Sequence, residues 1–142
     1  MTTDPREYAL KALEVAKQDL RRDKYLLPVA FILTDSEILD FNLDFRGAEQ
    51  KKMVYGKLVE TAKQKGGRAV ITINDGIETD PSSGERQDCI YLTVSGPQIV
   101  TWSLTVPYTQ AGDEIYFGDP IESVNDFLTL LRGWPTKQPN VS

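Results

Sequence analysis

Apolar residues in this chain recur with two periods, and the order in which these periods alternate limits the fold more than any other feature. From residue 4 to residue 24 they recur at helical spacing. From residue 100 to residue 106 they alternate strictly with Thr and Ser, as in a strand with one buried face. No long linker separates such segments, so we predict one α+β domain over residues 1–135 and a frayed tail over 136–142.

Three helices are predicted from their start and stop signals. Asp4 begins the first helix as an N-cap, with Pro5 at the first helical position and Glu7 in a capping box. The second helix covers residues 46–65 and ends at a pair of glycines. A second Asp-Pro-x-Glu cap begins at Asp119 and predicts a third helix. The apolar face of that helix comprises Val124, Phe127, Leu128 and Leu131.

Five to six strands complete the predicted domain. The run Val29–Leu33 is apolar throughout, which indicates a central strand covered on both faces, and residues 39–45 alternate and form a hairpin with it. Further strands are predicted over residues 68–74, 90–94, 100–106 and 115–117. Residues 75–86 are polar and rich in turn residues, so they are predicted to form a loop. The predicted core includes Ala30, Phe31, Ile32, Leu33, Ile71, Leu92, Trp102, Leu104 and Leu128.

The predicted order is α-β-β-α-β-β-β-(β)-α, with a single antiparallel-rich mixed sheet and helices packed on it. In element order alone this resembles roadblock/longin and profilin-type domains. The resemblance implies one helix on one face of the sheet and two on the other. It implies no activity, because a fold shared at this level hosts many functions.

The composition excludes several kinds of chemistry. The chain has 142 residues, no His and one Cys, Cys89. Without His it cannot build a Ser-His-Asp or Cys-His nucleophile, and one Cys cannot form a Cys-rich zinc site or an internal disulfide. We therefore predict no cofactor and a reducing, cytoplasmic location. The longest apolar run is too short to span a bilayer, and no signal-peptide pattern is present.

One candidate site for a divalent metal lies in the predicted loop. Asp75, Glu78, Asp80 and Asp88 could supply the several carboxylate oxygens that Mg²⁺ or Ca²⁺ requires. Their spacing does not match an EF-hand loop. A metal-dependent enzyme that uses these carboxylates is one alternative function, and a solvated surface loop is the plainer interpretation.

Charge and exposed apolar residues suggest a protein partner. Residues 1–68 carry a net charge of +2 and residues 69–142 a net charge of −7, for a total of −5. The negative net charge disfavours nucleic acid as a partner, whereas the uneven distribution of charge along the chain can orient an approaching protein. Leu10 and Met53 point away from the apolar arcs of their helices, and Trp134 is either a packed clasp or an exposed anchor. These three residues are candidates for an interface with a partner or in a homodimer.

The sequence therefore favours a small non-enzymatic interaction or regulatory module. The metal-dependent carboxylate enzyme is the first alternative. A small-ligand binding domain, with a pocket between the sheet and a helix, is the second.

Overall fold

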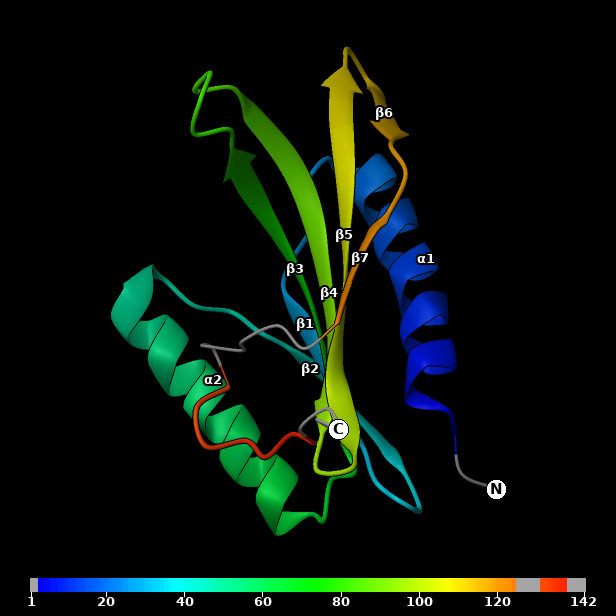
Figure 1. The fold of residues 1–142 in the computed structure, drawn as a ribbon, viewed down its shortest axis with the longest axis vertical. Coiled ribbons are helices and arrows are strands. Elements are labelled where there is room, and N and C mark those ends of the chain that lie inside the picture. Colours follow the sequence, from blue (N-terminus) through cyan, green and yellow to red (C-terminus); the bar gives the residue numbers. More distant parts are fainter. Residues whose placement is uncertain (1–2, 125–130, 138–142) are drawn as a thin grey trace, which may run out of the picture.

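The computed structural model describes residues 3–124 and 131–137, and these residues form three layers. Helix α1 (Pro5–Asp23) covers one face of a twisted sheet, and helix α2 (Gly47–Gln64) covers the other (Figure 1). The seven strands of the sheet are β1 (Val29–Leu33), β2 (Ile38–Asn42), β3 (Ala69–Thr79), β4 (Arg86–Gly96), β5 (Ile99–Ala111), β6 (Glu114–Phe117) and β7 (Ile121–Val124).

The strands are ordered β2-β1-β3-β4-β5-β6, and β7 also pairs with β5. All six strand pairings in the described residues are antiparallel. The α+β class and the antiparallel sheet are thus confirmed, whereas the sheet has seven strands and is not mixed. Helix α2 carries the chain from the edge strand β2 over β1 to β3. Neither helix is long and apolar enough to cross a membrane among the residues described.

The predicted third helix is not present in the described residues. Ile121–Val124, its expected first turn, forms strand β7, with Ile121 opposite Thr105 and Val124 opposite Trp102. Strand β6 occupies only the far part of the β5 edge, so backbone groups of β5 remain open for β7. Pairing with that edge outweighs the local cap signal at Asp119. Phe127 and Leu128 lie outside the described residues. Among the residues that the structure describes, each face of the sheet carries one helix, which differs from the arrangement that the resemblance implied.

The predicted loop over residues 75–86 is confirmed only at its centre, because residues 80–85 form the turn of a long hairpin and the residues on either side belong to its two strands. Strand β3 runs on to Thr79, which pairs with Arg86 of β4. The β4–β5 pairing ends at Asp88 and Tyr108, and from there the β3–β4 and β5–β6 hairpins diverge as two arms (Figure 1). The outer part of the β3–β4 arm extends beyond both helices and is exposed, so it tolerates the polar residues that suggested a loop. Helix α1 still packs against β6 of the other arm.

Helix α1 forms as its cap predicted and buries one stripe. The Asp4 side chain accepts a hydrogen bond from the Arg6 backbone N–H at 2.9 Å. The buried residues of the helix recur at helical spacing and pack on the side chains that β3, β4 and β5 direct to this face. That stripe comprises Ala9, Leu13, Ala16 and Leu20.

Helix α2 packs on the opposite face, around Tyr55. Its buried side chains contact Ala30 and Ile32 of β1, together with Leu131 and Trp134 from the segment that follows the sheet. The Tyr55 ring is 1% exposed, and its hydroxyl donates to Asn74 Oδ1 at 2.7 Å. Burial raises the pKa of Tyr55 to about 12.

Tyr55→Phe is expected to lower the free energy of unfolding by about 1 kcal/mol at pH 7, because the Asn74 oxygen loses its donor. An unfolded tyrosine ionises near pH 10, whereas folded Tyr55 stays protonated to about pH 12. The wild-type advantage should therefore shrink above pH 10 and be lost by about pH 12. Urea denaturation of both proteins across this range measures the difference. A constant difference would mean that Tyr55 does not titrate with unfolding.

The predicted core is confirmed for seven residues of the described chain. Ala30, Ile32, Leu33, Ile71, Leu92, Trp102 and Leu104 are all buried. Phe31 is only half-buried, although it lies in the middle of β1. The reason is the position of α1, which contacts β3, β4 and β6 and leaves the same face of β1 and β2 partly open.

Candidate functional site

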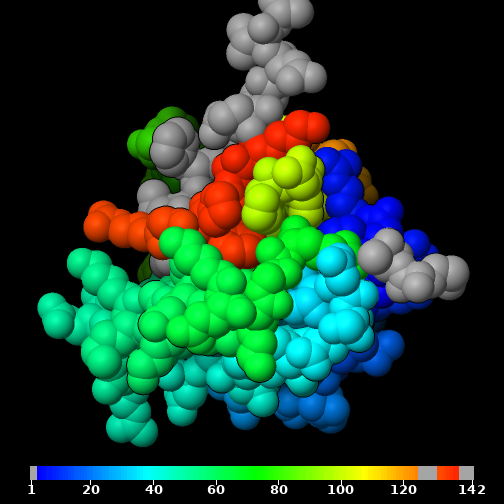
Figure 2. All heavy atoms as spheres, turned by 90° about the horizontal axis from the view of Figure 1, so that it is seen from below, coloured from blue at the N-terminus to red at the C-terminus, as the bar shows by residue number. Residues whose placement is uncertain are grey.

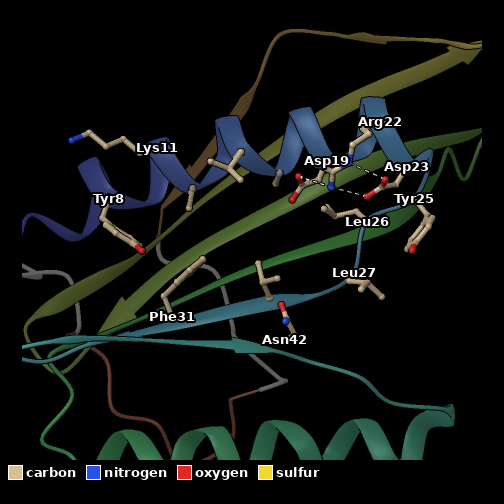
Figure 3. Close-up of a pocket in the computed structure, with 14 residues that line it drawn as sticks. Tyr8, Lys11, Asp19, Arg22, Asp23, Tyr25, Leu26, Leu27, Phe31 and Asn42 are labelled. Atoms are coloured by element: carbon tan, nitrogen blue, oxygen red, sulfur yellow. Dashed lines mark hydrogen bonds and ion pairs between the residues drawn. The ribbon is translucent and has the colours of Figure 1, made fainter.

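An apolar groove of about 460 Å³ lies between α1 and the β1–β2 hairpin (Figure 3). Three parts of the chain line it: one side of α1, the connection from α1 to β1, and the strands beneath. The lining residues are Tyr8, Lys11, Ala12, Val15, Ala16, Asp19, Arg22, Asp23, Tyr25, Leu26, Leu27, Val29, Phe31 and Asn42.

The groove exists because one helix cannot cover this broad sheet. A helix with its side chains is about 10 Å wide, whereas neighbouring strands lie about 4.8 Å apart, so a helix covers about two strands. Helix α1 packs over the middle of the sheet. Val29 and Phe31 therefore form an apolar floor beside it, to which β2 adds Asn42. Asp40 of β2 lies directly opposite Phe31, on the same face of the sheet and beside the lining residues.

Apolar side chains on the walls of the groove reach into solvent. The rings of Tyr8 and Phe31 meet edge to face, with their centroids 5.4 Å apart. Above them Val15 is 56% exposed, and on the connection after α1 Tyr25 is 58% and Leu27 53% exposed. Three large apolar residues are thus held at the mouth of one groove, rather than scattered singly over the surface.

At one end of the groove two carboxylates share one guanidinium, so this cluster carries a net charge of −1. Arg22 lies 3.2 Å from a carboxylate oxygen of Asp19 and 2.9 Å from one of Asp23 (Figure 3). The Arg22 hydrogen bond lowers the pKa of Asp23. Toward the other end, burial and the negative charge of Asp40 raise the pKa of Tyr8. The negative charge of the Asp40 carboxylate is therefore felt by a lining residue of the groove from the β2 side.

The structure does not bring the four predicted metal ligands together. Asp75 and Asp88 lie on the α1 face of the hairpin arm, Glu78 lies on the α2 face, and Asp80 is in the tip. Within residues 3–124 and 131–137, no three carboxylate or thiol side chains are grouped as metal ligands. A sequence-adjacent set of acids separates in this way because successive side chains of a strand point to opposite faces.

Three of these four acids accept hydrogen bonds from nearby residues instead. Asp75 accepts a hydrogen bond from the Tyr108 hydroxyl at 2.7 Å, and burial raises the pKa of Asp75 while that bond opposes the shift. Glu78 accepts from the Tyr91 hydroxyl at 3.2 Å. Asp80 caps the turn by accepting from the Ser82 hydroxyl and backbone N–H, which lowers its pKa.

The three predicted interface residues lie apart. Leu10 is 45% exposed on α1 and is not part of the groove lining, and Met53 is 62% exposed on α2. Because α1 and α2 cover opposite faces of the sheet, these two residues do not share one patch (Figure 1). Trp134 is 7% exposed and packs in the α2-side core.

A pocket between the sheet and a helix was predicted only as the second alternative and without lining residues, although Val15 carried a signal for its position. The apolar positions of α1 include Val15 as well as the buried stripe from Ala9 to Leu20, and together they span a wider arc than one sheet contact needs. Tyr25, Leu26 and Leu27 gave a second signal, since three large apolar residues are unusual in a short connection between elements.

Comparisons with known proteins do not assign the chain to a family. No family model matches the chain, and neither curated proteins nor solved structures show significant similarity to it.

Proposed function

We propose that this chain is a non-enzymatic interaction module, which binds an apolar segment of a partner protein in the groove beside α1. The observation that carries the proposal is the set of exposed apolar side chains, Val15, Tyr25 and Leu27, at the mouth of a groove with Phe31 in its floor. Burial of such side chains is the main favourable term in protein association.

The openness of the groove favours a protein segment over a small ligand. Small-molecule sites usually enclose most of the ligand surface. Here the space is a trough open to solvent, and residues on its rim are more than half exposed. The charged groups of the lining also lack the arrangement of a general acid and base over the floor. Arg22 is held by Asp19 and Asp23, and Lys11 points away from the strands (Figure 3).

The proposal can be tested by selecting peptides from a displayed random library for binding to the wild-type protein. The affinities of the selected peptides for the wild type and for two variants are then compared. Val15→Glu places a charge at the mouth of the groove, and selected peptides should bind it at least about tenfold more weakly. Met53→Glu introduces the same charge at an equally exposed site on α2, and it should leave binding unchanged. Fluorescence anisotropy of labelled peptides gives the dissociation constants.

Two results would contradict the proposal. Selection would either enrich no peptide, or enrich peptides whose affinity is equal for wild type and Val15→Glu. Circular dichroism of both variants checks that each remains folded, since both substitutions are at exposed positions and should change stability little.

A further inference from the structure

We propose that the partner segment in the groove is an amphipathic α-helix with basic residues along the flank that faces β2. This inference rests on the proposed function and specifies the chemistry of the partner at the same site. It is carried by the shape of the groove, by the backbone pairing of its floor and by the charge of its β2 rim.

The groove side of α1 has the residue pattern of a surface that packs against a helix. Its lining residues Tyr8, Ala12, Val15, Asp19 and Arg22 recur at intervals of four and three residues, so they form one stripe along the helix. The stripe contains the small residue Ala12, with Ala16 beside it in the lining, and small side chains let a neighbouring helix approach closely. The open strip over β1 and β2 is about two strands wide, which matches the diameter of a helix.

Backbone hydrogen bonding favours a helix over an extended segment. The groove floor is the face of a sheet, and β1 already pairs with β2 on one side and with β3 on the other. The free edge of β2 lies outside the groove floor, so an extended peptide lying on the floor would find no strand edge there and its own N–H and C=O groups would lose water without gaining partners. A helix satisfies these groups internally and needs only side-chain contacts from the groove.

The charge of the β2 rim specifies the flank of the partner helix. Asp35, Glu37, Asp40 and Asp44 are all exposed on the β1–β2 hairpin and its ends, and no Lys or Arg occurs between residues 35 and 44. Asp35 has an ion pair with Arg68 at 3.7 Å, and no ion pair within the described residues involves the other three. Asp40 lies on the groove face opposite Phe31. A basic flank would therefore meet uncompensated negative charge.

Three synthetic peptides of about four helical turns test the inference. All carry leucines along one face: the first has lysines on both flanks, the second has glutamates there, and the third repeats the first with a central proline that breaks the helix. The lysine peptide should bind the wild-type protein, and the other two should bind at least about tenfold more weakly. Binding of the lysine peptide should weaken as salt is raised.

A pair of charge-reversal variants assigns the effect to the β2 rim. Asp40→Lys should weaken binding of the lysine peptide about three- to tenfold and improve binding of the glutamate peptide. Glu60→Lys makes the same charge change at an exposed position on α2, on the other face of the sheet, and it should alter neither affinity. Val15→Glu should abolish binding of the lysine peptide, as the shared apolar contact requires.

The possible failures are distinguishable. Equal binding of the lysine peptide and its proline-broken form would overturn the helical partner, and equal effects of Asp40→Lys and Glu60→Lys would overturn the basic flank. In both cases the proposed function stands if Val15→Glu still weakens binding. If all designed peptides fail to bind while displayed peptides bind in a Val15-dependent way, only this inference falls. If neither class depends on Val15, both fall.

Discussion

Gly96→Ala is expected to lower the free energy of unfolding by about 3 kcal/mol, because the position has no room for a single methyl group. A Cβ built at Gly96 would overlap the backbone carbonyl oxygen of Arg68 and lie 3.1 Å from its carbonyl carbon. The Arg68 backbone cannot easily move away, since its N–H donates to the Leu33 carbonyl at 2.8 Å. A loss of this size should reduce the melting temperature by roughly 10 °C.

A matched glycine substitution provides the control for this measurement. Gly56 lies on the outer side of α2, where a Cβ would meet no atom within 4 Å. Gly56→Ala should therefore raise the free energy of unfolding by up to about 1 kcal/mol, through helix propensity. Urea and thermal denaturation followed by circular dichroism measure both variants. Equal stabilities for the two variants would mean that the close approach of β4 to Arg68 is absent in solution.

The parts of the fold that the sequence predicted correctly are those set by local periodicity. The alternation from Val100 to Val106 marks β5, and from Trp102 to Val106 every second side chain enters the α1-side core. Asp4 and Pro5 mark the start of α1 because a cap acts within a few residues of its own position. In both cases the information that decides the structure lies within the segment itself.

The third helix could not be rejected from local information. Asp119 and Glu122 form the same start signal as Asp4 and Glu7, yet the chain after Asp119 enters strand β7, which contains Glu122. What differs is the surroundings, because Glu122 lies beside β5 and accepts a hydrogen bond from Trp102 Nε1 at 2.8 Å. An open strand edge is a property of the assembled sheet, and no residue of the segment itself reveals it.

The groove was hidden for a related reason. The apolar run Val29–Leu33 predicts a strand buried on both faces, and that holds for Ile32 and Leu33 but only partly for Phe31. Whether a face is covered depends on which strands α1 crosses, and this is decided by packing of the whole sheet. The separation of the metal candidates was missed for a simpler reason, since taking residues 75–86 as a loop concealed the alternation of Asp75 and Glu78 between faces.

Trp134→Ala is expected to lower the free energy of unfolding by about 3–5 kcal/mol, the usual cost of removing a large buried aromatic side chain. Trp134 is 7% exposed and packs in the core that Tyr55 and Leu58 of α2 form with the sheet. The segment around it is fixed at both sides: the Trp134 N–H donates to the Leu131 carbonyl, and the Lys137 N–H donates to Ile99 at 2.9 Å. Figure 2 shows this red segment against the β4–β5 turn.

Two further variants separate packing from surface contact at this position. The Trp134 indole N–H is buried without a hydrogen-bond acceptor among the described residues, so Trp134→Phe gives up no hydrogen bond there and should cost less than about 1.5 kcal/mol. Met53→Ala changes a side chain that is 62% exposed on α2, the helix against which Trp134 packs. It should change the free energy of unfolding by less than about 0.5 kcal/mol. Chemical denaturation of the three variants gives the ranking. If Trp134→Ala proved as stable as Met53→Ala, the segment would not be a clasp, and Trp134 would return to its alternative role as an exposed interaction anchor.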